Sequence, residues 1–92
     1  MRTTKCFVYF IMAGKNKAIK IGNAVDIDRR IKELQIGNHL SLKLIASIEC
    51  DSKAHAVEME SRFHRLFSNQ KMRGEWFSGK INMNKLKIDA PG

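Results

Sequence analysis

The stretch AIKIGNAVDIDRR, residues 18 to 30, joins two kinds of secondary structure within thirteen residues. Lys20 stands between Ile19 and Ile21, an alternation typical of a β-strand whose two faces differ. Asp26 follows as a favourable N-cap, so a helix is expected to begin beside it. A strand that leads directly into a helix predicts a mixed α+β fold, with Lys20 on the strand face opposite the two isoleucines.

The residues before this stretch predict its pairing partner. CFVYFIMA, residues 6 to 13, is a continuous apolar run rich in branched and aromatic side chains, as expected of a strand covered on both faces. GKNK, residues 14 to 17, has the composition of a turn. The two strands should therefore form a hairpin.

The residues after it predict a second helical layer. The helix that begins at Asp26 should end in a left-handed turn at Gly37-Asn38, and residues 40 to 50 alternate as a third strand. Asp51 or Ser52 can cap a second helix. Its apolar stripe at helical spacing consists of Ala56, Met59, Phe63, Leu66 and Phe67.

The C-terminal part contains the motif GEWF, residues 74 to 77, in which Trp76 and Phe77 are expected to seal the sheet edge rather than stack on bases. INMNKLKI, residues 81 to 88, could close the fold as a short helix. The predicted order is β-β-α-β-α plus a C-terminal element. It describes a small three-stranded antiparallel sheet flanked by helices, in a single domain over residues 1–92 with a core at about 6–88.

The charge of the chain favours a polyanionic partner. Seventeen Lys and Arg against nine Asp and Glu give a formal net charge of +8 on 92 residues. A field of this sign attracts nucleic acid, although many small basic proteins do not bind it. No apolar run approaches the ~20 residues that span a bilayer, so no membrane partner is expected and a cytoplasmic location is predicted.

The cysteines do not indicate a metal site. Cys6 and Cys50 are far apart, and the histidines are scattered, so no zinc-binding spacing is present. Two buried, small apolar residues in a reducing compartment are the simplest interpretation, and the sequence leaves a disulfide open.

Three groups of residues could carry chemistry: Tyr9 with Lys20 on neighbouring strands, Arg29-Arg30 on the first helix, and Glu60 with His64 on the second. Each has a structural explanation as well. The tyrosine could be a core residue, the lysine an edge charge, and the others exposed helical pairs.

Their order resembles that of the GIY-YIG nuclease superfamily, in particular its phage-type branch. VYF, residues 8 to 10, stands where that family has GIY, and KIG, residues 20 to 22, stands where it has YIG. The arginine helix follows in AVDIDRRIKEL, the glutamate helix in EMESRFHRLF, and GEWF is intact.

This resemblance implies roles for individual residues. Tyr9, Lys20, Arg30 and Glu60 would be catalytic, with Glu60 rather than Glu58 holding a Mg²⁺ or Mn²⁺ ion. Lys20, Arg29, Arg30 and His64 would contact nucleic acid. A hard cation and a guanidinium suit phosphodiester hydrolysis because both neutralise charge that develops on the phosphoryl oxygens.

The sequence departs from the family pattern at two informative places. Lys20 replaces the second tyrosine, and we expect it to stabilise a Tyr9 phenolate or to hold the phosphate. The late asparagine of many members has no clear counterpart, and Asn82 and Asn84 are candidates by position alone.

The expected function is therefore a metal-dependent DNA endonuclease encoded by a phage or mobile element, acting in the host cytoplasm. One glutamate site cuts one strand, so a double-strand break would need a homodimer or two encounters. The alternatives are a non-cleaving nucleic-acid-binding or regulatory module on the same fold, and an interaction protein whose charge is incidental.

Overall fold

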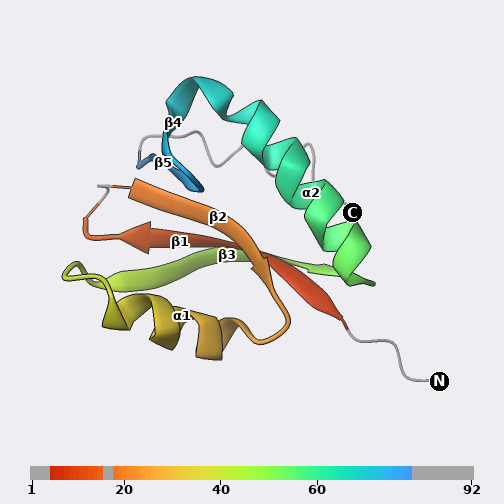
Figure 1. Cartoon of the computed structure of the whole chain (residues 1–92), viewed down its shortest axis with the longest axis horizontal. Coiled ribbons are helices and arrows are strands. Elements are labelled where there is room, and N and C mark those ends of the chain that lie inside the picture. The colour runs from red at the N-terminus through yellow and green to blue at the C-terminus, as the bar shows by residue number, and fades with distance from the viewer. Residues whose placement is uncertain (1–4, 16–17, 80–92) are drawn as a thin grey trace.

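The computed structural model describes residues 5–15 and 18–79 and shows an α+β fold, which confirms the predicted class (Figure 1). The helices and strands appear in the predicted order up to the second helix. Their bounds are β1 Cys6–Ala13, β2 Ala18–Ala24, α1 Ile27–Ile36, β3 Leu42–Cys50, α2 Lys53–Leu66, a 3₁₀ turn Ser68–Gln70, β4 Lys71–Arg73 and β5 Trp76–Ser78.

The sheet has more strands than the sequence predicted. Its strands are antiparallel and follow the order β3-β1-β2-β5-β4, so the short hairpin β4–β5 adds two strands to the expected three. Trp76 and Phe77 of the GEWF motif belong to β5, which pairs with the first residues of β2. The predicted closing helix at residues 81 to 88 lies outside the described residues.

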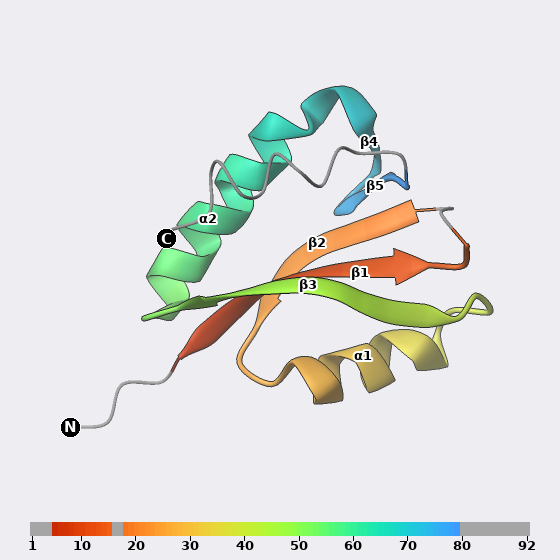
Figure 2. The ribbon, with the colours of Figure 1, turned by 180° about the vertical axis from the view of Figure 1, so that it is seen from behind.

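The two helices cover opposite faces of the sheet, as the views from front and back show (Figures 1 and 2). On the α2 face, alternate residues of β1 and β2 pack against the helix stripe in one buried cluster. Phe10 and Phe63 lie at its centre with their rings edge to face, 5.2 Å apart. Burial of each such ring contributes about 1.5–3 kcal/mol, so this face supplies most of the apolar core.

The helix ends follow the predicted caps with one exception. Asp26 accepts a hydrogen bond from the amide of Arg29, and Ser52 accepts one from the amide of His55. Ser52, rather than Asp51, is therefore the cap of α2. The left-handed stop predicted at Gly37 is wrong: Gly37 has φ −94°, and its amide bonds to the carbonyl of Gln35 instead.

The cysteines occur as free thiols, which agrees with the apolar interpretation. Cys6 and Cys50 are opposite one another in the β1–β3 ladder, and both are buried.

Candidate active site

Tyr9 lies in the middle of the sheet, on the face covered by α1. Its neighbours Val8 and Phe10 belong to the core on the α2 side, so alternation turns Tyr9 to the other face. Tyr9 is opposite Gly22 in the β1–β2 ladder and is only 1% exposed. A Cβ atom on Gly22 would lie 2.5 Å from the Tyr9 hydroxyl oxygen, so the glycine of KIG makes room for this ring.

Arg30 provides the positive charge at the Tyr9 hydroxyl. The Asp26 cap starts α1 so that Arg30 falls in its first turns, where its guanidinium interacts with the Tyr9 hydroxyl. Burial raises the pKa of Tyr9 above its usual value of 10.0, and the contact with Arg30 works against that rise. Tyr9 is consequently a neutral phenol at neutral pH.

Lys20 lies on the same face as Tyr9 but has different partners. It is opposite Ile11, one diagonal step from Tyr9 in the ladder. Its ammonium forms an ion pair with Glu75 at 3.1 Å and lies 5.4 Å from the centre of the Trp76 ring. Arg30 rather than Lys20 is thus the cation that interacts with the Tyr9 hydroxyl, so of the two roles expected for Lys20, stabilising a Tyr9 phenolate or holding the phosphate, the structure offers no support for the first.

Glu60 and His64 lie on α2, and therefore on the other side of the sheet. Asn23 of β2 donates a hydrogen bond of 2.6 Å to Glu60. The Nε2 atom of His64 lies 3.5 Å from the other Glu60 oxygen and 3.0 Å from the carbonyl oxygen of Ile21. The predicted pair one helical turn apart is present. Its contacts with Asn23 and with the Ile21 carbonyl hold it against β2.

Glu75 connects the two sides. It stands immediately before β5, its carboxyl group forms an ion pair with Lys20, and it lies near enough to Glu60 to raise the pKa of that carboxyl group. Burial is the largest influence on Glu60 and raises its pKa above 4.5, and the negative charge of Glu75 raises it further. Glu75 also raises the pKa of Tyr9. The pairing of β5 with β2 lies beneath the C-terminal end of α2 (Figure 1).

The remaining predicted residues are less involved. Arg29 is 78% exposed and pairs with Glu33 on its own helix. Glu58 is exposed, whereas Glu60 is half-buried.

Comparison with known protein families identifies the domain. A family model, that of the T5orf172 domain, matches residues 6–88, which is most of the chain. The chain belongs to the T5orf172 domain family. This phage-associated family is related to the GIY-YIG-like nuclease fold. No curated protein and no solved structure matches the chain.

The acidic groups of this T5orf172 domain suit a hard divalent cation. Glu60 is half-buried, and Asn23 and His64 each contact one of its oxygens, so one oriented carboxylate is available to a cation. Over residues 5–15 and 18–79, no group of three or more His, Cys, Asp or Glu side chains could hold a metal. Mg²⁺ needs only one or two carboxylates because it keeps several waters, whereas zinc takes three or four protein ligands.

Two residues of this site were missed by the sequence analysis. Asn23 directly follows the KIG motif, on the face opposite Lys20, and strand alternation could have placed it near α2. Glu75 gave no usable signal, because its position depends on the pairing of a three-residue strand with β2.

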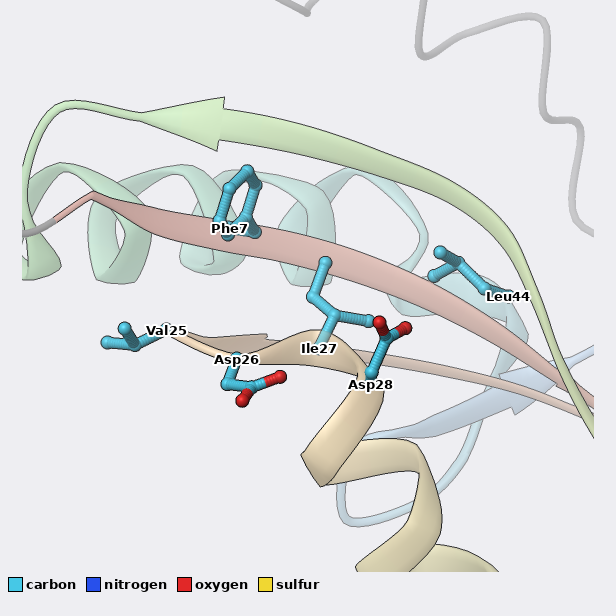
Figure 3. Close-up of a pocket in the computed structure, with 6 residues that line it drawn as sticks. All are labelled: Phe7, Val25, Asp26, Ile27, Asp28 and Leu44. Carbon is cyan, nitrogen blue, oxygen red and sulfur yellow. The ribbon is translucent and has the colours of Figure 1, made fainter.

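An open pocket of about 530 Å³ lies elsewhere on the T5orf172 domain, between β1, the start of α1 and β3 (Figure 3). It is lined by Phe7, Val25, Asp26, Ile27, Asp28 and Leu44. Two carboxylates and no cation make this pocket unfavourable for a phosphate. No helix among the described residues is long and apolar enough to cross a membrane.

Proposed function

We propose that this chain is a metal-dependent endonuclease of the GIY-YIG type that hydrolyses phosphodiester bonds in DNA. The observation that carries the proposal is that the family residues flank one stretch of β2: Tyr9 packs against Gly22 on one face of the sheet, and the Glu60 carboxylate accepts a hydrogen bond from Asn23 on the other. Membership of a phage-associated, nuclease-related family supports the same reaction class.

Arg30, Lys20 and Tyr9 would have different roles in the reaction, set by the chemistry of each side chain. Arg30 is 45% exposed and always charged, so it can turn to a phosphate oxygen while still contacting Tyr9. Lys20 adds a second cation on the same face. Tyr9 has a raised pKa and is a poor general base, so it acts by orienting the attacking water through its hydroxyl.

Glu60 is the residue that would hold the divalent cation. Asn23 and His64 each contact one of its oxygens, which fixes the orientation of the carboxylate. A bound Mg²⁺ or Mn²⁺ supplies Lewis-acid stabilisation of the charge that develops on the phosphate. Glu60 must be ionised to bind it, so cation binding should lower the Glu60 pKa and release a proton.

Plasmid nicking by the purified protein tests the proposal. Nicking should require Mg²⁺ or Mn²⁺, cease in EDTA, and be lost in Glu60→Ala while DNA binding is retained. Glu58→Ala is the matched control, because Glu58 lies on the same helix but is exposed, and it should cut like the parent.

Other outcomes separate the alternatives. Steeply salt-dependent DNA binding without any nicking would support the non-cleaving module. The absence of salt-sensitive binding would support an interaction protein. Persistent metal-dependent nicking in Glu60→Ala would refute the role given to Glu60.

A further inference from the structure

Two adjacent residues, Glu75 and Trp76, hold the Lys20 side chain in place. Its ammonium lies 3.1 Å from a Glu75 oxygen and 5.4 Å from the centre of the Trp76 ring, and the side chain is only 12% exposed. The main chain fixes these partners, because Lys20 is opposite Trp76 in the β2–β5 ladder and the Ile21 amide donates a 3.1 Å hydrogen bond to the Glu75 carbonyl. The Glu75-Trp76 dipeptide is thus placed beside Lys20 by the sheet itself.

Such confinement is unusual for lysine. Its flexible stem normally leaves the ammonium in water, and ordering it costs rotamer entropy. An ion pair and a cation–π contact together compensate for that loss. The surface pair Lys5–Glu49 offers a contrast, since at 2.7 Å it is shorter but its side chains are 60% and 52% exposed.

We propose that Glu75 and Trp76 are positioning residues, which hold the Lys20 ammonium at the junction of β2 and β5 so that it meets a phosphate of the bound DNA. The inference rests on the proposed function for the identity of the ligand. It gives Glu75 and Trp76 of the GEWF motif a role beyond sealing the sheet, because Phe77 alone supplies the buried ring of β5.

The charge of Glu75 allows this role to be separated from a structural one. A carboxylate beside a bound polyanion repels it, so neutralising Glu75 should not weaken DNA binding. The same change frees the Lys20 ammonium and should slow the chemical step. A drop in kcat without a rise in KM is therefore expected, whereas loss of structure would impair both.

The first test measures Lys20 without reference to activity. A confined, ion-paired ammonium exchanges its protons slowly and gives a lysine side-chain NMR signal, which Glu75→Gln should abolish. Trp76 is the only tryptophan, so its fluorescence reports the same contact. Glu75→Gln should change the emission in the parent but not in Lys20→Met. Glu49→Gln, at the exposed surface pair, should leave both readouts unaltered.

The second test is kinetic. Glu75→Gln should lower kcat for plasmid nicking by roughly tenfold, with KM unchanged or lower, and should cause no further loss in Lys20→Met. Glu75→Asp, which keeps the charge, should recover part of the rate. Equal losses in both backgrounds, or a Lys20 signal that persists in Glu75→Gln, would overturn the positioning role. A parent protein that fails to nick refutes the endonuclease instead, and the NMR result then decides on positioning alone.

Discussion

Replacing Gly22 with alanine should disturb the centre of the candidate site through a single steric contact. The added Cβ would lie 2.5 Å from the Tyr9 hydroxyl oxygen and 2.7 Å from its Cζ atom. Both separations are below any normal van der Waals contact. Because Tyr9 is 1% exposed, the ring has no free volume into which it could rotate.

The expected cost follows from this overpacking. Inserting a methyl group into a close-packed core typically destabilises a protein by roughly 1–3 kcal/mol, out of a total stability of about 5–15 kcal/mol. For a domain of this size each kcal/mol lowers Tm by about 4–8 °C. Moving the ring also separates the Tyr9 hydroxyl from Arg30, so nicking should fall more than stability alone would explain.

Urea and thermal unfolding of Gly22→Ala measure this cost, and Gly37→Ala is the matched control. Gly37 has φ −94° and nothing within 4 Å of an added Cβ, so alanine there should be neutral or stabilising by up to about 1 kcal/mol. If both variants unfold at the same urea concentration as the parent, the tight Tyr9–Gly22 packing described above is refuted.

Two further predictions concern pH. Because the folded-state pKa of Glu60 is raised, the folded protein binds this proton more tightly than the unfolded chain does, and stability should fall as pH rises from about 4.5 through the raised value. Urea unfolding of Glu60→Gln at several pH values should lack this fall. An identical pH dependence in parent and variant would contradict the burial of the carboxylate. Tyr9 is the only tyrosine, so ultraviolet titration reports its pKa directly. The pKa should lie above 10.0 in the parent and higher still in Arg30→Met, since the guanidinium lowers the pKa of Tyr9. A lower pKa in the variant would show that Arg30 does not contact the hydroxyl.

The sequence predicted those parts of the fold that local patterns determine. The apolar run of β1, the alternation around Lys20 and the stripe of α2 each specify an element and the face it buries. The hairpin β4–β5 was missed because strands of three residues have no measurable periodicity and exist only through pairing with β2.

In the candidate site too, sequence predicts what local motifs determine and misses what depends on tertiary contacts. Motif order singled out Tyr9, Arg30 and Glu60 as candidates, and the structure places Tyr9 and Glu60 against neighbouring residues of β2, Gly22 and Asn23, on opposite faces of the sheet. Sequence could not choose which cation contacts Tyr9, because that depends on how α1 crosses the sheet. Sequence could not place Glu75 in the site for a similar reason, since its partners are distant in sequence and meet it only through tertiary structure.

Because the β2–β5 ladder is short, the candidate site can lose its structure while the rest of the protein stays folded. Among the described residues only Ala18, Ile19 and Lys20 pair with β5, so the hairpin can detach while β1, β3 and α2 stay packed. Such an opening chiefly exposes Phe77, at a cost of about 1.5–3 kcal/mol, well below that of global unfolding. On warming, activity should therefore be lost in a local unfolding transition at a lower temperature than global unfolding. Amide hydrogen exchange in residues 76 to 78 would report this local opening.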